Sequence, residues 1–172
     1  GLPVKRFIIS TNENKEVPEY LKTGIYKAIS PSMNCISSAM NVGHPSNLAR
    51  IIALYGGIMN ESGTIIKSPD LTKMRKDFFG ISVSDEMTRK TIASCYEKYR
   101  LLLEPHGAVA WKGLEYYQAN KIPGEDEGHL YVSLETAHPA KFPDELLRIL
   151  DFIPAPPDSL GSLANLDEEY LS

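Results

Sequence analysis

The sequence of 172 residues has only two cysteines, no surplus of basic residues and no long apolar run. Its net charge of −4 argues against a general nucleic-acid-binding protein, which would carry an excess of lysine and arginine. No run approaches the roughly 18 apolar residues of a membrane span, so we expect no membrane partner either. Cys35 and Cys95 lie far apart and outside any zinc-binding spacing. We therefore expect reduced thiols in a cytoplasmic protein and no bound metal.

Several catalytic signatures are also missing. The sequence has no G-x-S-x-G motif of serine hydrolases, no G-x-G-x-x-G motif for a dinucleotide and no Walker loop. It opens at Gly1-Leu2-Pro3 without an initiator methionine or a secretory signal, and we therefore expect a portion of a longer protein. What remains is an ordinary globular composition, with 42% apolar and 23% charged residues and enough length to bury a core.

Short apolar runs alternate with amphipathic patterns along the chain. We expect strands at 4–9, 81–83 and 129–134, a strand or turn at 101–103, and helices at 17–24, 47–55, 69–80, 85–99, from 105 onward and from 143 to 150. Continuous apolar strands are typical of parallel sheets, so we predict an α/β fold whose parallel sheet is covered by helices on both faces. Residues 1–151 are expected to form the body. The proline-rich segment 152–172 is expected to dock on it through Leu160, Leu163 and Leu166.

Ligands of open parallel sheets bind at the carboxyl ends of the strands. The residues predicted there are mostly small hydroxyl and amide groups, with two histidines and one lysine: Ser10, Thr11, Asn12, Asn14, Ser82, Ser84, Glu104, His106, Thr136, His138 and Lys141. This set suits the recognition of a polar, anionic small molecule better than it suits a hydrolytic triad.

Three features of this set each allow two interpretations. Residues 104–110 open a helix with small side chains, which favours either a ligand site or a tightly packed turn. His106 and His138 could form an acid–base pair, although histidines beside proline and glycine are more often structural. The Thr136 hydroxyl is suited to bond a heteroaromatic nitrogen, or else to bond neighbouring backbone groups.

Five blocks of the sequence, in order, resemble the threonine synthase family. They are GLPVKRF with TNEN and VP in 1–18, SAMNVG with PSN and Arg50 in 38–50, SVSDE in 82–86, EPHGAV in 104–109 and TAHPAKF in 136–142. The tail at 160–168 also resembles the end of that family. The resemblance implies a pyridoxal-phosphate enzyme of fold type II that converts O-phospho-L-homoserine and water to L-threonine and phosphate. It also implies that the cofactor-bearing lysine and the phosphate-binding loop precede this chain.

The resemblance assigns roles to individual positions. Residues 1–151 would be the C-terminal portion of the large cofactor-binding domain. Thr136 is expected to meet the pyridine nitrogen, with Glu104, His106 and Gly107 beside the cofactor ring. The predicted substrate-binding residues are Asn12, Asn14, His138 and Lys141. No catalytic residue is expected in this chain, so we predict that it is inactive without its partner, the missing N-terminal part.

Two positions depart from the family pattern. Lys15 and Asn41 stand where the family often has aspartate, which would alter substrate choice if those acids contact substrate. Two other functions therefore stay open. One is a related phospho-lyase acting on another phosphorylated amino acid, and the other is a non-catalytic α/β module that binds a metabolite or a partner.

Overall fold

The structure, a computed structural model, describes residues 3–121 and 128–158. At its centre two parallel strands, β1 (Phe7–Thr11) and β4 (Phe78–Ser82), pair with Phe7 opposite Phe78 and Thr11 opposite Ser82. Because the strands are parallel, their carboxyl ends meet at one edge. The predicted α/β fold with a parallel sheet is confirmed.

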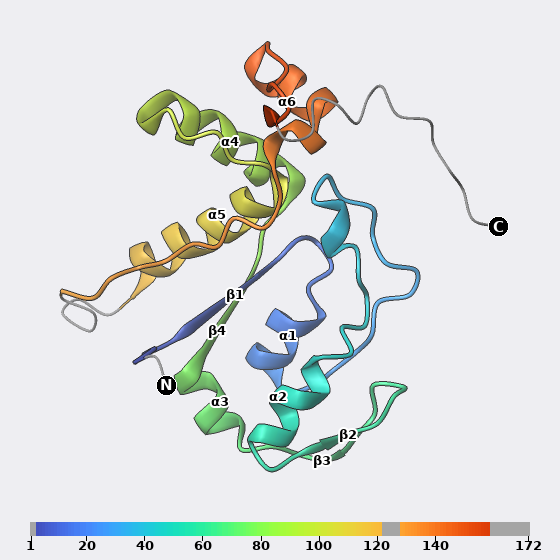
Figure 1. Cartoon of the computed structure of the whole chain (residues 1–172). Helices are drawn as coiled ribbons and strands as arrows, with labels where there is room; N and C mark the ends of the chain where they lie inside the picture. Colours follow the sequence, from blue (N-terminus) through green and yellow to red (C-terminus); the bar gives the residue numbers. More distant parts are fainter. Residues whose placement is uncertain (1–2, 122–127, 159–172) are drawn as a thin grey trace.

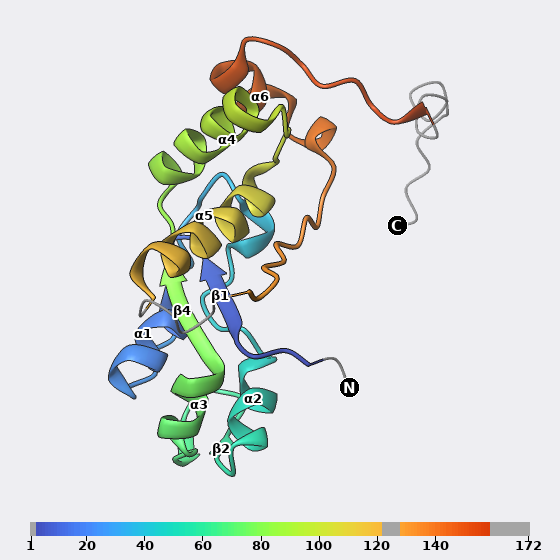
Figure 2. The ribbon, with the colours of Figure 1, turned by 90° about the vertical axis from the view of Figure 1, so that its left-hand side faces the viewer.

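Helices cover both faces of this strand pair. Figure 1 shows α1 (Glu16–Thr23) and α5 (Pro105–Asn120) on opposite sides of β1 and β4. On the α5 side, α4 (Asp85–Tyr99) packs against α5, and α6 (Pro143–Leu150) packs against α4. The three helices are stacked one upon another away from the sheet (Figure 2).

The remaining elements lie mainly beside α1, in the lower part of Figure 1. They are α2 (Leu48–Leu54), α3 (Leu71–Asp77) and an antiparallel hairpin of β2 (Ile58–Met59) and β3 (Ile65–Lys67), which the sequence pattern did not predict. Two short 3-10 helices, η1 (Ser38–Met40) and η2 (Pro139–Lys141), lie outside this group. None of the helices in the described part of the chain is long and apolar enough to cross a membrane.

Two apolar clusters form the core. One lies between α1, α2 and α3 and buries Val17, Tyr20, Leu21, Leu48, Ile52 and Met74. The other lies between α4, α5 and α6 and buries Ile92, Cys95, Leu103, Ala108 and Leu146. The strand pair therefore separates two helical layers, each with its own apolar interior.

The predicted bounds of α3 were wrong at both ends. The helix begins at Leu71 and not at residue 69, and its cap is Asp70, whose carboxylate accepts a hydrogen bond from the Lys73 N–H at 3.0 Å. Gly80 lies inside β4 and does not end the helix. A Cβ at Gly80 would stand 2.9 Å from the Cα of Pro18, so glycine is required there for α1 to pack closely on the strand.

The predicted strand at 129–134 is not formed, because a strand needs a neighbour to complete its hydrogen bonds and none is present among the described residues. The segment runs extended beside α5 (Figure 1). Its apolar side chains at Leu130, Val132 and Leu134 are 89%, 66% and 70% exposed. Residues 101–103 form neither a strand nor a turn, and run as an irregular connection between α4 and α5. The predicted docking residues Leu160, Leu163 and Leu166 lie outside the described residues.

Candidate functional site

The first turn of α5 is capped by a buried carboxylate. Glu104 is fully buried, and its two oxygens accept the N–H groups of His106 and Gly107, each at 2.8 Å. The positive end of the helix dipole favours a negative charge at this place. The first N–H groups of α5 are therefore satisfied by the chain itself and are not open to a phosphate group.

His106 joins three parts of the chain. Its Nε2 accepts the N–H of Ala39 in η1 at 3.0 Å, so Nδ1 must carry the proton that it donates to Glu104 at 2.5 Å. The ring also packs on Phe142, with a centroid separation of 5.2 Å. His138, in contrast, is exposed and accepts the N–H of Ala140 at 3.1 Å. These contacts favour the structural interpretation of both histidines over an acid–base pair.

Gly107 leaves room for a second carboxyl group. A Cβ at this position would stand 2.1 Å from Oε2 of Glu135, so the carboxyl of Glu135 rests directly on the glycine. Glu135 also hydrogen-bonds to the carboxyl of Glu104. Burial, together with this bond and the charge of Glu104, raises the pKa of Glu135 to about 7. The sequence analysis missed Glu135, and no local sequence signal marks its contact with a glycine in another element.

The predicted cofactor partner Thr136 is the residue that follows Glu135. It is exposed, and its hydroxyl has no hydrogen-bond partner among the described residues. The alternative in which this hydroxyl satisfies neighbouring backbone groups is therefore not the one seen. Lys141 is also exposed, in η2. The chain thus brings Glu104, His106, Gly107 and Thr136 to one end of α5.

Asn12 and Asn14 lie at the carboxyl end of β1, as predicted, but both are 1% exposed. The Asn12 side chain accepts the N–H and the side-chain amide of Asn14 and donates to Asn41 at 2.9 Å. Asn14 in turn exchanges two hydrogen bonds with the backbone of Met33, at 2.7 and 2.9 Å. Both side chains therefore hold loop 33–41, and contact with a substrate would require one of these bonds to be exchanged.

The departure at Asn41 has a structural explanation. Its oxygen accepts from Asn12 and from the N–H of Cys35, while its amide nitrogen donates to Asn34 and to the carbonyl of Cys35. An aspartate could replace the acceptor but neither donor. Lys15 occupies the N-cap position of α1 and makes no capping bond with its side chain.

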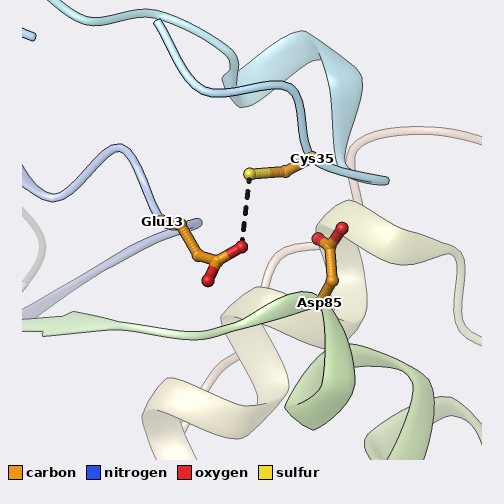
Figure 3. A group of neighbouring side chains, drawn as sticks. All are labelled: Glu13, Cys35 and Asp85. Carbon is orange, nitrogen blue, oxygen red and sulfur yellow. Dashed lines mark hydrogen bonds between the residues drawn. The ribbon is translucent and has the colours of Figure 1, made fainter.

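A group of three side chains ties the same loop to the start of α4. Figure 3 shows Glu13, Cys35 and Asp85, whose ligand-type atoms lie within 4.8 Å of one another. Asp85 accepts the N–H of Ile36 at 3.1 Å, and the Cys35 thiol lies 3.9 Å from Glu13. Burial, with the charges of Asp85 and Glu13 acting in the same direction, raises the pKa of Cys35. A protonated thiol is a hydrogen-bond donor and a poor metal ligand. The group joins the residues after β1, the start of α4 and loop 33–41.

A hollow of about 400 Å³ lies along α1 and is lined by Lys15, Glu16, Glu19, Thr23, Ile25, Lys27 and Ile29. None of the predicted site residues lines it. Glu16 has a buried carboxylate oxygen without a hydrogen-bond partner in the described part of the chain. Burial raises the pKa of Glu16.

The chain is similar to threonine synthases. Residues 108–172 match the family model described as threonine synthase, C-terminal. The chain is 34% identical to the threonine synthase of Haemophilus influenzae over 98% of this chain and 35% of that protein. It is 30% identical to the enzyme of Saccharomyces cerevisiae over 84% of this chain and 32% of that protein. The chain thus spans about one third of the length of these relatives.

Solved structures agree with this similarity. A crystal structure of threonine synthase from Escherichia coli superposes with a TM-score of 0.74 and 32% identity, over 97% of this chain and 34% of that one. A structure of threonine synthase with bound pyridoxal phosphate, from Brucella melitensis, superposes with a TM-score of 0.81 and 28% identity, over 99% and 38%. The fold of this chain is therefore the fold of the corresponding third of these enzymes. The resemblance read from the sequence is confirmed.

Proposed function

We propose that this chain, which is related to the threonine synthases, is the C-terminal portion of a pyridoxal-phosphate enzyme of threonine biosynthesis. The complete enzyme would convert O-phospho-L-homoserine and water to L-threonine and phosphate in the cytoplasm. The observation that carries this proposal is the similarity of 99% of the chain to a threonine synthase with bound pyridoxal phosphate. In this proposal, residues 1–151 belong to the cofactor-binding domain and 152–172 form its tail.

The residues at the start of α5 are compatible with the cofactor, which would supply an electron sink for the reaction when bound. Thr136 offers an exposed, unengaged hydroxyl for the pyridine nitrogen. Gly107 has no side chain, but its face is covered by the carboxyl of Glu135 and is not open to the ring. Glu104 already uses the first N–H groups of α5. We therefore assign the cofactor's phosphate to the part of the enzyme that this chain does not span.

The substrate residues are proposed in two groups. His138 and Lys141 are exposed in and beside η2, shortly after Thr136, where a cation suits a phosphorylated substrate. Asn12 and Asn14 hold loop 33–41 in position over the carboxyl ends of the strands. In this proposal Asn12 and Asn14 shape the substrate site, and His138 and Lys141 contact the substrate.

The proposed partner is the remaining two thirds of a threonine synthase. The exposed apolar side chains of Leu130, Val132 and Leu134 alternate along an extended segment, which is the pattern of a strand with one buried face. An extended segment with exposed apolar side chains and no neighbouring strand tends to pair with another chain. We assign this edge to the contact with the missing part.

The test compares the chain alone with a joined protein in which the N-terminal part of a threonine synthase precedes it. We expect the joined protein to release threonine and phosphate from O-phospho-L-homoserine, and the chain alone to release neither. In the joined protein, Thr136→Ala should weaken cofactor affinity while Thr136→Ser retains it, with Thr72→Ala as an exposed control. Turnover by the chain alone, or a cofactor-loaded joined protein without threonine formation, would contradict the proposal.

A further inference from the structure

Glu135 stands apart from the other acidic residues because its carboxyl lies against another carboxyl. The residue as a whole is exposed, yet its acidic end is turned inward onto Gly107 and bonded to Glu104. Two carboxyl groups that hydrogen-bond to each other need one proton between them. The two carboxyl groups therefore share one proton whenever they are in contact, which we call the closed state.

The proton belongs to Glu135 because the oxygens of Glu104 already act as acceptors. They receive the N–H groups of His106 and Gly107 and the Nδ1–H of His106. His106 has no second proton to offer, since its Nε2 accepts from Ala39. Glu104, at the start of α5, is the titratable group that acts on Glu135, through a hydrogen bond and its charge.

The contact fixes one end of an otherwise loosely held segment. Two contacts join the segment to the ends of α5: Tyr131 meets Lys121 after the last turn of the helix, and Glu135 meets Gly107 in the first turn. Between them, the side chains of Val132 and Leu134 are 66% and 70% exposed. The position of Thr136 therefore depends on the contact made by its neighbour, Glu135.

We propose that Glu135 is a positioning residue, whose protonated carboxyl bonds to Glu104 over Gly107 and thereby holds the Thr136 hydroxyl at the start of α5. When Glu135 ionises, its proton passes to solvent and two carboxylates face each other, so the contact opens. The importance of Thr136 rests on the proposed function, whereas the carboxyl contact does not. A failure of threonine synthesis and a failure of this contact are therefore separate results.

The pH range of the effect follows from the two states of Glu135. In the open state its pKa is the ordinary 4.5, and in the closed state it is about 7. Closing therefore takes up a proton between these values, so the closed state is most favoured below pH 4.5. It weakens as the pH rises, by up to about tenfold per pH unit, and the change levels off above about pH 7.

The experiment is amide hydrogen exchange of residues 133–137 in the full chain, corrected for intrinsic exchange rates, across this range. We expect wild-type protection to fall with rising pH and to level off near 7. Glu135→Gln keeps a donor that does not titrate, so its protection should stay high and flat. Glu61→Gln, at an exposed acid beside the β2–β3 hairpin, should behave like wild type.

A second variant removes the contact while leaving Glu135 in place. The three nearest atoms to a Cβ at Gly107 all belong to the Glu135 carboxyl, so Gly107→Ala should displace that carboxyl. We expect low, flat protection of residues 133–137 in this variant. Wild-type protection that does not change with pH, a Glu135→Gln variant that keeps the wild-type slope, or a Gly107→Ala variant with wild-type protection would each overturn the proposal.

Discussion

Loop 33–41 and the segment 128–136 differ in whether this chain supplies the contacts that each of them needs. Around loop 33–41 the buried amides of Asn12 and Asn14 are all engaged within the chain. The segment 128–136 instead exposes alternating apolar side chains and is attached near its ends. In the first region, loop 33–41, this chain alone supplies the hydrogen-bond partners of both buried amides. The second has the pattern of a strand whose neighbour is supplied by another part of the enzyme.

The largest loss of stability is expected from a substitution that removes hydrogen bonds around loop 33–41. Asn12→Ala removes the acceptor of Asn14 and a donor to Asn41, which leaves buried polar groups unpaired. We expect a loss of roughly 2 to 4 kcal/mol in the free energy of unfolding, measured by urea denaturation. Asn47→Ala, at an exposed amide that makes no capping bond, should change stability by less than about 0.5 kcal/mol. Equal effects of the two variants would contradict the account.

Lys15→Asp should change the stability by a smaller amount and in the opposite direction, because it adds a cap to α1. An aspartate at this N-cap position can accept a backbone N–H of α1, which the lysine leaves without a side-chain partner. We expect a gain of about 0.5 to 1 kcal/mol in urea denaturation, with Lys27→Asp, in an exposed loop, as the control. A loss of stability would show that the backbone before α1 does not admit a cap.

Glu16 is an exception near the first region, because its buried carboxylate oxygen has no partner among the described residues. Burial raises its pKa above 4.5, so the folded state keeps a proton that the unfolded state loses. Its contribution to stability is therefore fullest below pH 4.5 and is lost as the pH rises through the folded-state pKa.

Glu16→Gln should abolish that loss, so the variant should gain stability over wild type as the pH rises from 4.5 towards neutrality. Urea denaturation at several pH values measures this difference. Glu97→Gln, at an exposed residue of α4, is the control and should show no such trend. A difference between Glu16→Gln and wild type that is the same at every pH would indicate a packing effect.

The smallest effect is expected in the second region of the chain alone. Val132→Lys places a charge where the side chain is already 66% exposed, so the unfolding free energy should change by less than about 0.5 kcal/mol. In the joined protein the same substitution should be strongly destabilising. Ile66→Lys, equally exposed at 66% on the distant hairpin, should be mild in both proteins. A mild effect of Val132→Lys in the joined protein would remove the distinction between the two regions.

Local sequence signals predicted the starts of α4 and α5. Ser84 caps α4, and Pro105 with Glu104 opens α5, because these residues satisfy N–H groups only a few positions away. Gly80 misled the prediction, since a glycine after an amphipathic run is typical of a helix end and also of close packing on a strand. Here Gly80 lies within β4, where the close packing of α1 leaves no room for a side chain.

Contacts between distant parts of the chain were not predictable in the same way. The polar residues of the strand ends were identified, but their burial under loop 33–41 depends on pairings that no short motif encodes. The same holds for Glu135 over Gly107. The strand predicted at 129–134 was wrong for this chain, because a strand forms only where a neighbour completes its hydrogen bonds.

The most direct test of the account is the exchange of the backbone amides of Leu130 and Val132. In the chain alone these amides should exchange quickly, because they have no ladder partner in the described structure. In the joined protein they should be strongly protected as members of a sheet. Equally fast exchange in both proteins would contradict the central claim that this edge is completed by the rest of a threonine synthase.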